Sequence, residues 1–338
     1  MPFNTTAFNE FVDNVERSVL QQVTDMKPNL VRSIFTPVPW NEGDGEKVTF
    51  NSICLSGFAP RVDENENYPI VNPSKGNELS KTQLQYGTRL DITRRMMKFN
   101  TRYMESKMVA RSQKLIDRLR DGLDLELTMQ AFAEADQTTF TPIGKPAYNI
   151  ATSDSAAVAS ASHSYGGISF SNILSGGGAL SKGNLTTLIN QAINTTPDDF
   201  GTYIAPNMDT IVIAENQTMI VKCHELFGSS LTPETSNNAS NFYGGTGSFK
   251  VVSLKFGNRT AAGATDTTSN VYRWLLMDSE MCKEPWQLMM AEEPTVEQEF
   301  TDHDNLLRKI LATQFAAFAI VQPQGTQYSL STVAPTLA

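Results

Sequence analysis

The sequence has few of the residues on which metal and redox sites are usually built. It contains three histidines and three cysteines in 338 residues. The cysteines, Cys54, Cys223 and Cys282, are far apart and odd in number, so they match neither a zinc-binding spacing nor a disulfide framework. We therefore expect the protein to reside in a reducing compartment.

Long apolar runs are also missing. No stretch approaches the roughly 18 uninterrupted apolar residues of a membrane span, so we expect no membrane association. The first residues, MPFNTTAFNEF, lack a basic region followed by an apolar core, and we expect no secretory signal. No segment repeats, which argues against solenoids and propellers. The chain is nevertheless 40% hydrophobic, enough to bury a real core.

Motifs for catalysis are incomplete wherever they begin. A serine–histidine pair at His163 would need a fixed acid and an oxyanion hole, and no Gly-x-Ser-x-Gly elbow exists. Adjacent helical residues point about 100° apart, which disfavours Cys223 and His224 as joint metal ligands. No other Cys or His lies three or four residues away, so we predict a buried Cys223 and a partly exposed His224. His303, between two aspartates, is expected in a turn.

The glycine run at residues 176–178 also falls short of a phosphate-binding loop. Such a loop needs its lysine directly after the last glycine, whereas Lys182 comes four residues later. The acidic residues between Glu292 and Asp304 are expected on solvated strand faces or paired across interfaces. The sequence therefore predicts no catalytic, cofactor-binding or metal site, and no enzyme.

The most informative element that is present is one long predicted helix, Phe99 to Ala135. Its 37 residues contain no proline and a single glycine, Gly122. At about 1.5 Å rise per residue it would be roughly 55 Å long, whereas globular helices average about 11–12 residues. Apolar residues recur along it at helical spacing. Such a rod is too long for one compact core and indicates a structural strut.

Charge is distributed unevenly along the chain. The net charge is −9, yet residues 94–120 carry nine basic and two acidic residues, giving this segment +7. Four bases of the segment share one helix face, and the acidic remainder offers a complement, so we predict association between copies. A solvated helix face and nucleic-acid binding are the alternatives. The predicted contacts between copies are Trp40, Asp63, Glu64, Glu66, Lys107, Arg111, Lys114 and Arg118.

The remaining pattern predicts extended limbs around a compact α/β unit. An amphipathic helix is expected between Phe8 and Val23, and a long hairpin from strands Lys47–Leu55 and Leu79–Ile92. An isolated hairpin is marginal in water, so it needs support from a neighbour. The other predicted elements are a loop at 136–183 with a short strand near 168–170, helices at 184–194 and 215–227, strands at 209–214, 249–254, 272–277, 286–290 and 296–300, an apolar segment at 306–321 and a frayed tail at 322–338. Trp274 and Trp286 are expected in the core, and Trp40 is expected as a contact anchor.

The order of these parts resembles a tailed-bacteriophage major capsid protein of the Hong Kong ninety-seven type. The likeness extends over about residues 41–321 and rests on order rather than on one diagnostic motif. The segments that carry it are Ser162-His163 in the Ser-rich loop, the helix at 184–192, Ala205-Pro206 with the strand through Ile213, the helix to Gly228, and the strand Tyr272–Met277.

The resemblance implies an α+β fold with named parts. These are an N-arm at 1–40, an extended E-loop hairpin at 41–98, a P-domain with its spine helix and a Ser/Gly-rich loop at 99–183, an A-domain at 184–278, and returning P-domain strands, a terminal helix or strand and a tail at 279–338. It also implies a head protein that forms pentamers and hexamers of an icosahedral shell around double-stranded phage DNA. The virion would be assembled in the host bacterial cytoplasm.

The partners that the resemblance implies are further copies of the chain, a scaffolding protein, a portal, an optional decoration protein, and DNA without sequence-specific contacts. Some relatives begin with a charged helical region that acts as a scaffold; this sequence starts without one, so a separate scaffolding protein is implied. The alternatives are an encapsulin-like compartment, another phage structural subunit such as a tail-tube or decoration protein, and a hydrolase built on His163 or on Cys223 with His224.

Overall fold

The computed structural model describes residues 30–40, 45–54, 61–62, 74–93, 101–228, 243–244, 249–260, 262–266, 270–302 and 307–337. The amphipathic helix expected before Val23, the acidic segment from Asp63 to Glu66, and His303 lie outside these residues. None of the helices in the described ranges combines the length and hydrophobicity needed to cross a bilayer.

The predicted long helix is confirmed almost to its ends. It consists of α3 (Thr101–Thr128), which continues directly into a π-helical turn, η2 (Met129–Ala133). Leu123, Leu127 and Phe132 bury the C-terminal part of the helix in the largest core cluster. Two distant side chains satisfy carbonyls at this end: the Tyr328 hydroxyl donates to the Ala131 oxygen at 2.9 Å, and Arg273 Nη1 donates to the Ala133 oxygen at 2.7 Å. Side chains from other elements thus fix the end of the rod.

A four-stranded sheet, here called the long sheet, runs beside this helix. Its order is β1 (Thr36–Val38), β12 (Trp286–Asp302), β13 (Leu307–Ile320) and β4 (Leu84–Thr93). β1 pairs with β12 in parallel, and the other neighbours are antiparallel. The two short strands predicted within 286–300 form one strand with bulges, and the apolar segment at 306–321 is a strand.

A second four-stranded sheet, here called the short sheet, forms the compact unit. Its order is β10 (Lys250–Leu254), β9 (Thr210–Ala214), β11 (Trp274–Met277) and β14 (Thr326–Ser329). Two helices, α4 (Lys182–Thr195) and α5 (Gln217–Phe227), contribute to the core cluster on one of its faces. Ser181 and Asn216 cap these helices with their side-chain oxygens. The strands and helices predicted for this unit are confirmed, and so is the burial of Trp274 and Trp286.

The predicted hairpin is correct in its first strand and wrong in its second. β2 (Lys47–Cys54) pairs with β3 (Ser74–Thr82), but the segment predicted as Leu79–Ile92 breaks at Gln83. Beyond the break, β4 leaves the hairpin and joins β13 in the long sheet. The backbone nitrogen of Gln83 donates to the Glu46 carbonyl, and its side-chain Nε2 donates to the Gly45 carbonyl. Alternating polarity identifies a strand but does not identify its partner.

The prediction of a frayed C-terminal tail is also wrong. All four residues of β14 are buried, and the strand pairs antiparallel with β11 along its full length. Its polar side chains, such as Gln327 and Ser329, are buried because their backbone completes the short sheet. Tyr328 from the same strand enters the largest core cluster.

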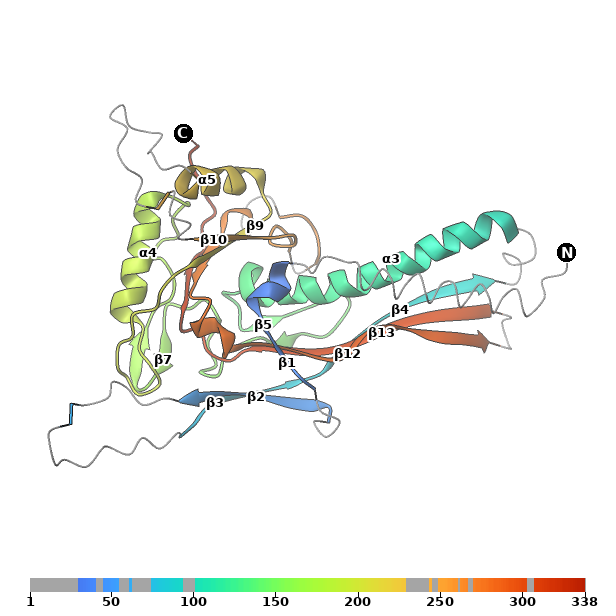
Figure 1. Cartoon of the computed structure of the whole chain (residues 1–338), viewed down its shortest axis with the longest axis horizontal. Coiled ribbons are helices and arrows are strands. Elements are labelled where there is room, and N and C mark those ends of the chain that lie inside the picture. The colour runs from blue at the N-terminus through green and yellow to red at the C-terminus, as the bar shows by residue number, and fades with distance from the viewer. Residues whose placement is uncertain are drawn as a thin grey trace.

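The elements form a compact body with a projecting arm (Figure 1). The arm consists of the N-terminal part of α3 and the adjoining parts of β4, β12 and β13, with the helix on one face of the sheet. The β2–β3 hairpin lies against the other face near the body, where Val48 and Phe50 share a cluster with Met289 and Ala317. Short elements complete the fold: β5 (Thr139–Phe140), β6 (Tyr148–Asn149), β7 (His163–Tyr165), β8 (Ile168–Phe170), η1 (Leu30–Ile34), η3 (Asn270–Tyr272) and η4 (Met281–Lys283). β8 confirms the short strand predicted near residues 168–170.

Candidate functional site

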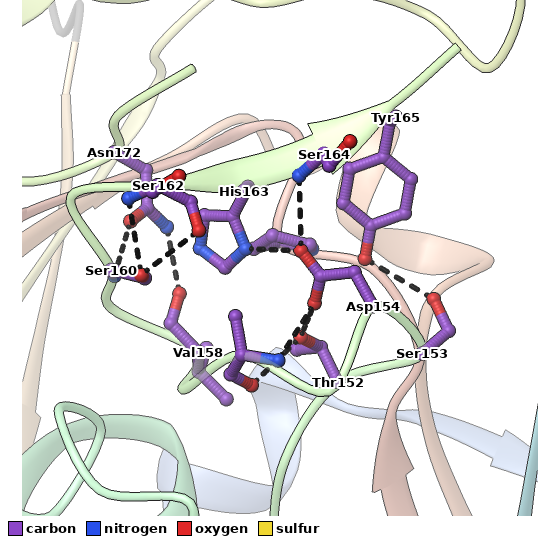
Figure 2. Close-up of polar contacts among 12 residues, drawn as sticks. Thr152, Ser153, Asp154, Val158, Ser160, Ser162, His163, Ser164, Tyr165 and Asn172 are labelled. Atoms are coloured by element: carbon purple, nitrogen blue, oxygen red, sulfur yellow. Dashed lines mark hydrogen bonds and ion pairs between the residues drawn. The ribbon is translucent and has the colours of Figure 1, made fainter. Parts of the chain in front are cut away.

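The segment around His163 contains the acid that sequence reasoning missed. His163 Nδ1 lies 2.9 Å from Asp154 Oδ2, nine residues earlier in the chain (Figure 2). The Asp154 carboxylate also accepts hydrogen bonds from the Thr152 hydroxyl and from the backbone amides of Ala156 and Ser164. Burial alone would raise the pKa of this carboxyl, but hydrogen bonds from His163 and Thr152 lower it to about 2. The pair is therefore a fixed hydrogen-bonded unit.

This unit lacks the exposure and the nucleophile that catalysis requires. The His163 side chain is 0% exposed, and its second nitrogen, Nε2, has no hydrogen-bond partner among the residues that the structure describes. The nearby hydroxyls bond elsewhere: Ser160 Oγ donates to the Ser162 carbonyl, and Ser162 Oγ lies 3.1 Å from Ser169 Oγ. A substrate has no access to the imidazole, and the arrangement holds the 152–172 segment together.

The other candidate chemical residues also serve the fold. Cys223 is buried as predicted, and burial raises its thiol pKa to about 12, which keeps it protonated and unreactive. In the part of the chain that the structure describes, no group of three or more His, Cys, Asp or Glu side chains is placed to hold a metal ion. Gly178, the last glycine of the run, is held by hydrogen bonds: its amide donates to Ser329 Oγ, and Trp274 Nε1 donates to its carbonyl.

The predicted contact residues lie on the outside wherever the structure describes them. Trp40, two residues beyond β1, is 37% exposed. Lys114 and Arg118 are exposed on α3. The acid Asp121 on the same helix pairs with Lys255, which lies after β10, at 2.8 Å. Lys107 and Arg111 belong to α3, but their side chains fall outside the description, as do Asp63, Glu64 and Glu66.

The arm adds a surface that sequence reasoning did not identify. Residues of one strand alternate between the two sheet faces, so the face opposite α3 carries Leu311 and Phe315 of β13. Both are partly exposed, and their register partners on β4, Arg89 and Gln85, are exposed. In Figure 1, no described helix or strand of the chain lies against this face of the arm beyond the end of the β2–β3 hairpin.

A long helix beside a bulged sheet, joined to a compact α/β body and a separate hairpin, is a fold also found in a phage capsid structure. The capsid structure of cyanophage P-SCSP1u is similar to this chain with a TM-score of 0.50 at 12% identity, covering 89% of this chain and 88% of that one. This likeness confirms, at the level of the fold, the resemblance to phage capsid subunits.

Two further solved structures are similar at lower scores. The mature capsid of bacteriophage PhiM1 matches with a TM-score of 0.49 at 11% identity, covering 92% of this chain and 89% of that one. A virus-like particle from Pyrococcus furiosus matches with a TM-score of 0.44 at 9% identity, covering 94% and 97%. Neither a protein-family model nor a curated protein sequence matches the chain.

Proposed function

We propose that this chain is the major capsid protein of a tailed bacteriophage, which assembles into pentamers and hexamers of an icosahedral shell around double-stranded DNA. The observation that carries the proposal is the fold shared with the P-SCSP1u capsid over 89% of the chain. The chemistry agrees with a structural role, because the one Asp–His pair described is sealed inside the protein.

The parts of a capsid subunit map onto the elements in order. Residues up to β1 correspond to the N-arm, and the β2–β3 hairpin to the base of the E-loop. The long helix and long sheet correspond to the P-domain, and the short sheet with α4 and α5 to the A-domain. In this mapping β4 belongs to the P-domain, so the hairpin ends at Thr82 rather than at residue 98.

The arm provides the surface on which a neighbouring copy rests. The chain's own hairpin already covers part of the sheet face opposite α3, where Phe50 and Val48 pack over Ala317. The row formed by Phe315 and Leu311 continues this face outward. We infer that the outer part of the face receives the hairpin of a second copy, which buries the row in the same manner.

Each such contact can be modest because a closed shell repeats it across every subunit. The basic stripe of Lys107, Arg111, Lys114 and Arg118 and the acidic residues Asp63, Glu64 and Glu66 remain proposed contacts between copies. Contacts between exposed charges weaken as salt rises, so added salt should slow assembly if they matter.

The experiment shortens the hairpin without disturbing its base. Cys54 and Ser74 are register partners, so an Asn-Gly turn can replace residues 55–73 and close the hairpin. We expect a folded subunit with an unchanged melting temperature that forms no shells in electron micrographs. Normal shells from this variant would contradict the role of the hairpin.

A matched variant keeps the loop length and replaces Asp63, Glu64 and Glu66 by the corresponding amides. It separates the effect of length from the effect of charge, because it should still assemble but with a weaker dependence on salt. The contents of wild-type shells separate the two shell-forming functions: packaged DNA identifies a virion, and a packaged enzyme identifies an encapsulin-like compartment.

A further inference from the structure

A short loop after α4 presents two aromatic side chains to solvent. We call residues 197–203 the aromatic loop; Phe200 is 49% exposed and Tyr203 is 54% exposed. Ile193, in the last turn of α4, is exposed as well. These three side chains lie within eleven residues of the chain, and no other stretch of that length in the described ranges has three exposed large apolar side chains. Clustered exposed apolar groups mark interaction sites more often than isolated ones do.

The backbone of the aromatic loop is held in one conformation. Asp198 Oδ1 accepts from the amides of Phe200 at 2.9 Å and Thr202 at 2.7 Å, and the Asp198 amide donates to the Thr202 carbonyl at 2.7 Å. Gly201 has φ +81°, which a glycine adopts without strain. Because the loop is already ordered, docking costs little additional backbone entropy, and its aromatic side chains are suited to act as anchors.

The loop is also fastened to the base of the hairpin. Asp199 Oδ1 accepts from Asn77 Nδ2 of β3 at 3.1 Å and from Gln322 Nε2 at 2.6 Å. On its other side the loop lies against the turn between β7 and β8, where a Cβ on Gly166 would fall 2.1 Å from the Gly201 nitrogen. The loop is therefore hydrogen-bonded to β3 of the hairpin and packed against the β7–β8 turn.

We propose that the aromatic loop is a contact site for a second copy of this chain, with Phe200 and Tyr203 as its anchors. The inference rests on the proposed function, in which the hairpin of one copy lies on the arm of a neighbouring copy. Because the aromatic loop is hydrogen-bonded to β3 of that hairpin, the loop is brought close to the same neighbour. The loop's two carboxylates, Asp198 and Asp199, disfavour a polyanion such as DNA. Aromatic anchors with few free charges are typical of the core of a protein interface.

The first test removes the aromatic groups and compares two double variants. Phe200→Ser with Tyr203→Ser is matched by Ile143→Ser with Val333→Ser, whose original side chains are 64% and 61% exposed. Both variants should melt as the wild type does. Light scattering should show that the loop variant needs about tenfold more protein for half-maximal assembly, since it loses two anchors. Equal assembly by the two variants would overturn the inference.

The second test separates this inference from the proposed function. Tyr203→Cys and Ile143→Cys are labelled with a thiol reagent at low and high protein concentration, with the wild-type chain as background. Self-association should protect position 203 at least severalfold and leave position 143 reactive. If the chain associates and position 203 stays reactive, the loop inference fails and the proposed function stands. If the wild-type chain never associates, both fail.

Discussion

Tyr328 connects the C-terminal strand to the end of the long helix, and its removal should lower stability by a calculable amount. The ring is buried in the largest core cluster, and its hydroxyl donates to the Ala131 carbonyl in the π-helical turn. Truncating a buried aromatic side chain to alanine costs about 3–5 kcal/mol. At about 2.1 cal/mol/K of unfolding entropy per residue, 338 residues give roughly 0.7 kcal/mol/K. Tyr328→Ala should therefore lower the melting temperature by about 4–7 °C.

A second substitution isolates the hydrogen bond, and a third serves as a control. Tyr328→Phe keeps the ring and leaves the Ala131 carbonyl without its donor, a loss of about 1–3 kcal/mol, or roughly 1–4 °C. Val333→Ala, in the exposed part of the same tail, should change the melting temperature by less than about 1 °C. The assay is thermal unfolding of unassembled protein followed by circular dichroism. A Tyr328→Ala variant that melts with the wild type would refute the packing of the tail.

Three further predictions concern single residues. The lowered pKa of Asp154 stabilises the fold above the ordinary carboxyl pKa, and this stability is lost between about pH 4 and pH 2. Asp154→Asn should flatten the dependence of the unfolding free energy on pH in this range, as measured by denaturant titration. An unchanged slope would count against the Asp154–His163 pair. Burial raises the pKa of Glu126, so its ionised form is disfavoured in the folded state and wild-type stability should fall as pH rises through that pKa. Glu126→Gln should remove this fall in stability. A steeper fall in the variant would contradict the raised pKa of Glu126. Gly166→Ala should cost more than Gly167→Ala, because both have positive φ but only Gly166 faces the Gly201 backbone, and equal melting temperatures would refute this difference.

Local periodicity was sufficient to predict most elements of the body. The long helix, α4, α5 and the strands of the short sheet appear in the sequence as clear apolar repeats between breakers and caps. Ser181 and Asn216 begin helices, and Gly228 ends one, for reasons that act within a few residues. Such signals place elements correctly because the side chains that decide them are close in the chain.

The errors have a different physical origin. Residues 84–93 pair with β13, which lies more than 200 residues further along the chain, and not with β2. The alternation of polar and apolar residues carries no information about that choice of partner. The tail contains polar residues such as Gln327, and only the backbone pairing with β11 explains their burial. Similarly, nothing in the spacing of Asp154 and His163 shows that the irregular segment between them folds back and brings the two side chains together.

In the proposed shell, a single copy leaves the outer face of its arm and its hairpin uncovered, and further copies cover them. Sedimentation velocity and negative-stain imaging of the purified wild-type chain, prepared alone and with its scaffolding protein, measure this self-association. We expect large, hollow, closed particles built from many subunits. A chain that remains a monomer at high concentration under both conditions would contradict it.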